Sequence, residues 1–267
     1  MKVGCLGPEA SFSYQAAKNI FNDAEIVTCN SITTVFDLVN DGEIDKGIVP
    51  LENSTGGSVS VTLDELIAKN VFIEAEYFLK VEHSLLSNYK LKDITQIFSH
   101  PQAFSQCKEW LKNNAKDKDL VEMTSTAKAA EKASQIDFSG AIASTIAGEK
   151  YGLGILEHKI NDSGQNETRF IIFSKKENNP EKKEKTSLIF GAKNKPGSLF
   201  TILENFKNEN INLTKLESRP AIKRDWEYLF FVDFEGNLAD ENIKRAVKKI
   251  GEEAIEIKLL GSYSRIK

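Results

Sequence analysis

Short apolar segments alternate with segments of helical apolar spacing from the start of the chain to about residue 175. The strands expected from these segments lie within residues 1–6, 44–51, 97–102 and 140–144. Parallel strands need a crossover that is usually a helix, so this alternation is typical of an α/β fold with a largely parallel sheet. We therefore predict an α/β domain over residues 1–178.

The order of elements changes beyond residues 175–185, a run of mixed charges with a proline that indicates a solvated linker. The strands expected after it are residues 186–192, 211–218, 226–234 and 254–260, and the helices are residues 196–208 and 240–250. This β-α-β-β-α-β order is the ferredoxin-like split motif, so we expect a second domain over residues 186–267. Its small antiparallel sheet would leave edges and a face that often pair with a second copy.

The composition argues against several classes of protein. The chain has 267 residues, 40% of them hydrophobic and 28% charged, which is the balance of a soluble globular protein. Its net charge of −4 provides no general attraction to nucleic acid or to anionic membranes. No apolar run approaches the roughly 20 residues of a membrane-spanning helix, and the N-terminus lacks the apolar core of a signal peptide. We expect a cytoplasmic protein that binds neither nucleic acid nor membrane.

The patterns of cysteine, histidine and glycine do not indicate a metal or a cofactor. The cysteines, Cys5, Cys29 and Cys107, are odd in number and form no C-x-x-C pair, which fits a reducing cytosol. The histidines show no metal-ligand spacing. The glycines Gly4 and Gly7 lack the spacing of a dinucleotide-binding loop or a P-loop. We expect neither a metal nor a cofactor.

Residues 165–173 combine a polar turn with a strand. Residues 169–173 are rich in β-branched and aromatic side chains and predict a largely buried strand, preceded by turn-forming residues. Thr168 therefore stands where a rigid strand holds a hydroxyl group beside open space. Side chains alternate along a strand, so Thr168 and Arg169 point to opposite faces, and we favour Thr168 as the functional residue. Arg169 then faces either a ligand or a structural carboxylate, for which Glu52 is a candidate.

Small polar residues gather where helices are expected to begin. They lie at residues 11–13, 53–58, 99–102 and 125–126. Free backbone N–H groups and the helix dipole make such positions suitable for anions, at the strand ends where α/β proteins bind ligands. Taken alone, these residues are more often helix caps than ligand sites. Ser99, Gln102 and Gln106 share one helical face, for which an exposed amide face is an equally good explanation.

Motifs along the whole chain resemble those of one family, in the same order. The motifs are Gly7-Pro8-Glu9-Ala10-Ser11-Phe12-Ser13, Val49-Pro50-Leu51-Glu52-Asn53-Ser54, Ser99-His100-Pro101-Gln102-Ala103, Ser125-Thr126-Ala127 and Asn166-Glu167-Thr168-Arg169-Phe170. They resemble the successive signatures of prephenate dehydratase, and Gly197-Ser198-Leu199-Phe200 and Glu217-Ser218-Arg219-Pro220 resemble motifs of its ACT regulatory domain. The departures are small: Ala10-Ser11 where Gly-Thr is usual, Phe104 for a smaller residue, and a polar Ser198.

The resemblance implies decarboxylation and dehydration of prephenate to phenylpyruvate, on the route to phenylalanine, without a cofactor. It also implies a two-lobed catalytic domain similar to type II periplasmic binding proteins. One lobe would cover about residues 1–72 and 161–178, and the other residues 73–160. The implied catalytic residues are Thr168, Ser99 and Gln106. The implied substrate-binding residues are Asn53, Ser54, Ser11, Ser13, His100, Gln102, Ser125, Thr126 and Arg169.

For the second domain, the resemblance implies binding of L-phenylalanine as an effector in a homodimer or homotetramer. The implied effector-binding residues are Gly197, Ser198, Leu199, Phe200, Glu217, Ser218, Arg219 and Pro220. Gly197 is expected to permit close backbone approach. For Phe200, a plain core position on an amphipathic helix is the stronger explanation. Two alternatives stay open from the sequence: arogenate as the substrate, and a non-catalytic sensor of amino acids or oxo acids.

Overall fold

The computed structural model of the chain describes residues 1–177, 184–220 and 228–266. These residues form two compact units. Unit 1 comprises residues 1–35, 48–59 and 78–170, and unit 2 comprises residues 36–47, 60–77 and 171–267. The units do not coincide with the predicted domains, because unit 2 joins the predicted second domain to segments of the first. The domain and lobe boundaries therefore stay predictions, and most of the predicted linker lies outside the described residues.

The first sheet of unit 1 brings distant parts of the sequence together. β1 (Lys2–Leu6) lies between β2 (Glu25–Cys29) and β3 (Lys46–Asn53), and β11 (Glu167–Ser174) lies on the other side of β3. β1 and β2 pair in parallel and are connected by α1 (Phe12–Ile20). The short β4 (Gly57–Ser58) pairs with the end of β3. Asn53 at the end of β3 therefore lies beside the start of β11, where the sequence predicts a functional Thr168.

The second sheet of unit 1 has the order β10-β6-β9-β7-β8. Its strands are β6 (Ser84–Leu86), β7 (Gln96–Ser99), β8 (Asp119–Glu122), β9 (Ser139–Ala143) and β10 (Ile155–Glu157). Its helices are α4 (Pro101–Gln106), α5 (Lys108–Asn114), α6 (Thr126–Ala133) and α7 (Thr145–Tyr151), with a 3₁₀ turn at Leu91–Asp93. β7 is parallel to β8 and β9, as predicted, whereas β6 is antiparallel to β9 and to β10.

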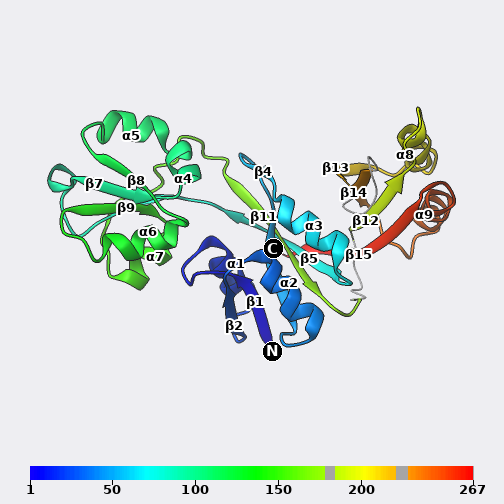
Figure 1. Cartoon of the computed structure of the whole chain (residues 1–267), viewed down its shortest axis with the longest axis horizontal. Helices are drawn as coiled ribbons and strands as arrows, with labels where there is room; N and C mark the ends of the chain where they lie inside the picture. The colour runs from blue at the N-terminus through cyan, green and yellow to red at the C-terminus, as the bar shows by residue number, and fades with distance from the viewer. Residues whose placement is uncertain (178–183, 221–227, 267) are drawn as a thin grey trace. The chain divides into compact units, whose positions relative to one another are not determined.

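Both faces of this second sheet are covered by helices (Figure 1). Ala141 and Ala143 of β9 pack in one core with α6 and α7, whereas Ile142 between them packs in another core with α4 and α5. Alternate side chains of a strand point to opposite faces, so a strand covered on both faces needs apolar residues throughout. This explains why residues 140–143 contain no polar side chain. In this sheet, the N-termini of α4 and α6 lie at the carboxyl ends of the parallel strands β7 and β8.

Unit 2 contains the predicted β-α-β-β-α-β arrangement. Its elements are β12 (Lys185–Ala192), α8 (Ser198–Asn208), β13 (Leu213–Pro220), β14 (Tyr228–Glu235), α9 (Glu241–Glu253) and β15 (Glu256–Ile266). The strand order is β13-β14-β12-β15, with antiparallel pairs, so the ferredoxin-like prediction is confirmed. Phe190 and Phe234 of the sheet pack against Phe206 of α8 and Ile250 of α9. The predicted start of the third strand, Trp226, lies outside the described residues.

Three further elements complete unit 2. α2 (Ile32–Asp41), α3 (Ser60–Ala68) and β5 (Phe72–Lys80) come from the first part of the chain. Residues 75–77 of β5 pair in parallel with residues 264–266 of β15. The ammonium group of Lys258 donates hydrogen bonds to the carbonyl oxygens at the end of α3, including that of Leu66 at 2.8 Å. The mixed α/β class predicted for the chain is thus found in both units.

The described part of the chain offers neither a membrane-spanning helix nor a cluster of metal ligands. None of the helices there is both long enough and apolar enough to cross a membrane. Over the same residues, no group of His, Cys, Asp and Glu side chains is arranged to hold a metal ion.

Candidate active site

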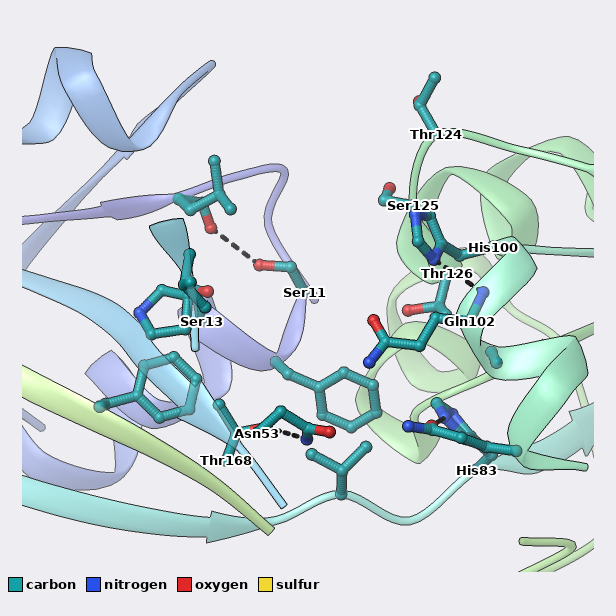
Figure 2. A pocket seen from close by; sticks show the side chains of 18 of the residues that line it. Ser11, Ser13, Asn53, His83, His100, Gln102, Thr124, Ser125, Thr126 and Thr168 are labelled. Atoms are coloured by element: carbon teal, nitrogen blue, oxygen red, sulfur yellow. Dashed lines mark hydrogen bonds between the residues drawn. The ribbon is translucent and has the colours of Figure 1, made fainter. Parts of the chain in front are cut away.

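A pocket of about 280 Å³ lies within unit 1, and most of the predicted site residues line it. Its polar lining consists of Ser11, Ser13, Asn53, His83, His100, Gln102, Gln106, Thr124, Ser125, Thr126 and Thr168. Figure 2 shows Ser11 and Ser13 across the pocket from Ser125 and Thr126. Its apolar lining includes Leu6, Phe12, Pro50, Val59, Val81 and Phe170. The pocket can therefore hold a small molecule that has both an apolar body and polar ends.

The N-termini of α1 and α6 open onto this pocket. Ser11 caps α1 by accepting a hydrogen bond from the Tyr14 N–H at 3.2 Å, and Ser125 caps α6 by accepting one from the Lys128 N–H at 3.1 Å. The capping explanation and the ligand-site prediction therefore apply to the same residues. Among the described residues that line the pocket, none is Lys or Arg. Attraction for an anion would therefore come from N–H groups, hydroxyls and helix dipoles.

Asn53 has a fixed side-chain orientation at the base of the pocket. Its Oδ1 accepts hydrogen bonds from the N–H groups of Thr55 and Gly56, at 3.1 and 2.9 Å. Its Nδ2 must then be the group that donates to Thr168 Oγ1 at 2.8 Å and to Asn166 Oδ1 at 3.0 Å. Because Thr168 Oγ1 accepts from Asn53, its own proton can be donated into the pocket.

The hydrogen bonds of Asn53 continue into a closed ring of uncharged side chains. Asn166 Nδ2 donates to Gln106 Oε1 at 2.9 Å, and Gln106 Nε2 donates to Thr55 Oγ1 at 2.7 Å. The Thr55 hydroxyl donates to Asn53 Oδ1 at 2.7 Å, which closes the ring. We call Asn53, Asn166, Gln106 and Thr55 the amide ring. Every donor and acceptor in it is assigned by the two backbone N–H groups at Asn53.

Ser99, Ser54 and Arg169, which were also predicted, are not among the residues that line the pocket. Ser99 is fully buried and donates to the Ile142 carbonyl oxygen at 2.7 Å, which joins β7 to β9 below the start of α4. Ser54 donates to the Gln165 carbonyl oxygen and accepts from the Glu167 N–H, so it fastens the loop to β11. Arg169 is buried, and its neighbour Thr168 lines the pocket, as strand alternation predicts. Whether Arg169 faces a ligand or a structural carboxylate stays a prediction.

Sequence reasoning missed His83, Thr55, Asn166 and Thr124. Asn166 stands in the Asn166-Glu167-Thr168-Arg169-Phe170 motif, and Thr124 precedes the Ser125-Thr126 pair, so both lie next to residues that the sequence does indicate. His83 carried none, because an isolated histidine near an apolar strand is an ordinary core residue. It is 3% exposed, and burial lowers its pKa below the ordinary value. Its Nε2 lies 2.9 Å from Gln106 Oε1, so it joins the amide ring to the pocket wall.

The predicted effector residues lie in unit 2. Gly197 is the N-cap of α8, with φ at 84°, and a Cβ there would meet no atom within 4 Å. This glycine serves a left-handed backbone, and the close backbone approach expected at an effector site stays a prediction. Phe200 is 68% exposed, so its predicted core position is wrong, whereas Leu199 packs against the core. Ser198 begins α8.

The Glu217-Ser218-Arg219-Pro220 motif forms the end of β13. Its side chains alternate in exposure, with Glu217 and Arg219 half-buried and Ser218 and Pro220 exposed. The Arg219 guanidinium donates to both carboxylate oxygens of Asp64, at 3.1 and 3.2 Å, and to Ser60 Oγ at 3.2 Å. The motif therefore connects the ferredoxin-like sheet to α3 within unit 2.

Comparisons with known proteins agree with this architecture. The family model for prephenate dehydratase matches residues 3–178, and the model for the ACT domain matches residues 186–252. The bifunctional chorismate mutase/prephenate dehydratase of Aquifex aeolicus is 40% identical over 99% of this chain and 74% of its own length. The prephenate dehydratase of Methanocaldococcus jannaschii is 39% identical over 96% of this chain and 95% of its own length.

A solved structure agrees as well. The crystal structure of prephenate dehydratase from Arthrobacter aurescens in complex with L-Phe superimposes with a TM-score of 0.94 at 29% identity. The match covers 99% of this chain and 90% of that one. The family model alone accounts for well over half of the chain. The chain therefore belongs to the prephenate dehydratase family and carries an ACT domain.

Proposed function

We propose that this chain converts prephenate to phenylpyruvate in the pocket of unit 1. The observation that carries the proposal is the orientation of Thr168. Its hydroxyl oxygen accepts from Asn53 Nδ2 at 2.8 Å, which leaves its proton free to meet a group in the pocket. The reaction needs a donor of this kind where the ring hydroxyl departs.

The reaction makes modest demands on the protein. The bond between the ring and its carboxylate breaks, and its electron pair moves into the ring as carbon dioxide leaves. The bond between the ring and its hydroxyl breaks at the opposite carbon, and the hydroxide takes up a proton to become water. Formation of the aromatic ring supplies the driving force. The protein has to hold a dianion in place and to assist the departing oxygen.

Thr168 would assist that oxygen by hydrogen bonding. A threonine hydroxyl is too weak an acid to transfer its proton outright, so we assign it donation and orientation, with the net proton drawn from the buffered solvent through a water relay. Asn53 would orient the Thr168 hydroxyl through a hydrogen bond. Gln106 would orient Asn53 indirectly, because Asn166 is hydrogen-bonded to both. The predicted catalytic role of Ser99 would then be indirect, because Ser99 supports the strand below the start of α4.

The dianion would be bound without cationic side chains. Ser11 and Ser13 at the start of α1, and Ser125 and Thr126 at the start of α6, line the pocket on different elements. Helix N-termini favour negative charge, and the pocket can contact two carboxylates from different directions. His100 and Gln102, at the start of α4, would add polar contacts.

The experiment that tests the activity is incubation of the purified chain with prephenate and, separately, with arogenate. The aromatic product is followed by its ultraviolet absorption and identified by mass spectrometry. We expect phenylpyruvate from prephenate. Turnover of arogenate alone would assign the chain to arogenate dehydration. Turnover of neither compound would favour the sensor alternative and contradict the proposal.

Regulation by L-phenylalanine is the second part of the proposal. The Arthrobacter aurescens structure contains L-Phe, and the chain has an ACT domain whose two motifs lie at the start of α8 and the end of β13. An effector can act only by favouring one of two arrangements of the protein. We expect a homodimer or a homotetramer, because β13 is an edge strand of its sheet. Light scattering of the full chain, with and without L-phenylalanine, measures the assembly.

A further inference from the structure

His83 is a buried polar group in the pocket that the mechanism above does not use. Its side chain lines the pocket and the residue is 3% exposed. Its Nε2 contacts Gln106 Oε1 at 2.9 Å, whereas Nδ1 has no hydrogen-bond partner among the described residues. A buried polar atom without a partner is rare in a folded protein and calls for an explanation.

The backbone holds the imidazole ring in place. The His83 N–H donates to Asn161 Oδ1 at 2.7 Å, and the His83 carbonyl oxygen accepts from the Ile160 N–H at 2.9 Å. The ring of Phe12 stands edge-to-face against the imidazole, with centroids 5.5 Å apart. Figure 2 shows His83 on the pocket wall beside the polar residues. The imidazole that carries the orphan nitrogen is therefore a fixed part of the pocket wall.

The amide ring determines which nitrogen of His83 carries the proton. Two backbone N–H groups fix Asn53 Oδ1 as an acceptor, so Asn53 Nδ2 donates to Asn166 Oδ1. Asn166 Nδ2 must then donate to Gln106 Oε1. Since Gln106 Oε1 is an acceptor, His83 Nε2 donates to it. In the neutral imidazole, Nδ1 then carries only a lone pair.

The neutral form is also the one that burial favours. Desolvation lowers the pKa of His83, and the hydrogen bond to Gln106 opposes this shift without cancelling it. The wall of the pocket therefore contains a hydrogen-bond acceptor with a fixed position, in addition to the donors at the helix N-termini. An acceptor of this kind repels carboxylate oxygens and attracts an O–H or N–H group.

We propose that His83 Nδ1 accepts a hydrogen bond from an O–H or N–H group of the bound ligand, which makes His83 a substrate-binding residue. This inference rests on the proposed function, because it names a contact in the same pocket. The donor has two possible sources. The ring hydroxyl is present in both prephenate and arogenate, whereas the ammonium group is present in arogenate alone.

A pair of variants separates contact with the ligand from support of Gln106. In His83→Asn, the amide oxygen can stand near the position of Nδ1, but the donor to Gln106 is lost. In His83→Gln, the amide nitrogen can still reach Gln106, but no acceptor stands near the position of Nδ1. We expect His83→Gln to lower kcat/KM by about 10- to 100-fold and His83→Asn to lower it less. The reverse order would show that His83 acts only through Gln106, and would overturn the proposal.

The two substrates identify the donor. An equal loss of kcat/KM for prephenate and arogenate in His83→Gln assigns the contact to the ring hydroxyl. A loss confined to arogenate assigns it to the ammonium group. No loss with either substrate overturns the proposal, provided that circular dichroism shows both variants to be folded. Activity of the unaltered chain on prephenate is measured in the same assay, so failure of the proposed function is seen separately.

A spectroscopic measurement covers the case in which the variants do not fold. The chain has 3 histidines, so ¹⁵N labelling of histidine gives few imidazole signals. We expect a signal of an unprotonated Nδ1 for His83 in the free protein. Prephenate, added to the slow Thr168→Ala variant, should move this signal in the direction of a nitrogen that accepts a hydrogen bond. A protonated Nδ1 in the free protein, or an unchanged signal with ligand, would overturn the proposal.

Discussion

The Thr168 hydroxyl can donate into the pocket because its oxygen already accepts a hydrogen bond from Asn53, which leaves its proton for another group. We predict that Thr168→Ala lowers kcat by about 100- to 1000-fold, the usual cost of losing one well-placed donor. Thr168→Ser, which keeps a hydroxyl, should lose much less. Steady-state kinetics with prephenate measures both variants, and thermal unfolding shows whether they stay folded. A folded Thr168→Ala variant with near-normal turnover would remove Thr168 from the mechanism.

His83 also has a consequence for stability. Burial holds the pKa of His83 below its ordinary value, so the unfolded chain takes up a proton at higher pH than the folded chain. The free energy of unfolding should therefore fall as the pH decreases through about 6.5. We predict that this part of the decrease is absent in His83→Gln.

Urea unfolding at several pH values measures this effect. His158→Gln is the matched control, because it removes an exposed histidine from the same unit. It should keep the pH dependence of the unaltered chain. An unchanged pH dependence in His83→Gln would contradict the assignment of a lowered pKa to His83.

At the scale of helices, the start of α6 has two functions that can be separated. Ser125 caps the helix and lines the pocket. Asn and Asp both cap helices well, so Ser125→Asn and Ser125→Asp should differ little from each other in stability. The carboxylate of Ser125→Asp would repel a bound dianion, and we predict an increase in KM for prephenate of about 10-fold or more. Ser125→Asn should stay within a few-fold of the unaltered chain, and equal KM values for both variants would argue against an anion at this helix.

The sequence was sufficient to predict the elements but not all of their contacts. The β-α-β-β-α-β order was predictable because each element has a clear apolar period, although the second strand begins at Leu213 and not at residue 211. The pocket positions of Ser11, Ser125 and Thr168 followed from caps and strand ends. The buried position of Ser99 could not be predicted, because its hydrogen bond to Ile142 joins strands far apart in sequence. The amide ring could not be predicted either, because its members also come from distant parts of the chain.

At the scale of the whole molecule, an ion pair and the chain itself connect the ACT domain to a residue of the pocket. Arg219 of the ACT domain binds Ser60 and Asp64 of α3, and α3 starts directly after Val59, which lines the pocket. If α3 conveys the effect of L-phenylalanine, weakening this ion pair should weaken inhibition. We predict that Asp64→Asn raises the inhibitory concentration of L-phenylalanine several-fold, with little change in kcat.

The matched control for that prediction is Glu209→Gln. Glu209 accepts from Arg245 at 2.7 Å, and this ion pair joins α9 to the residue that follows α8. Its loss should leave inhibition unchanged. Inhibition curves for prephenate turnover, measured on the full chain, compare the two variants. Equal effects of the two substitutions would show that α3 has no special part in regulation.

The amide ring consists of groups that carry no charge, and the direction of every bond in it follows from the NH₂ ends of Asn53, Asn166 and Gln106. Slow hydrolysis of one such side-chain amide exchanges a donor for a carboxylate oxygen and hardly alters its shape. A stored preparation that has undergone this ageing reaction would keep its fold but lose the alignment of the Thr168 proton. We therefore expect a stored preparation to lose activity through hydrolysis of an amide before it loses its fold.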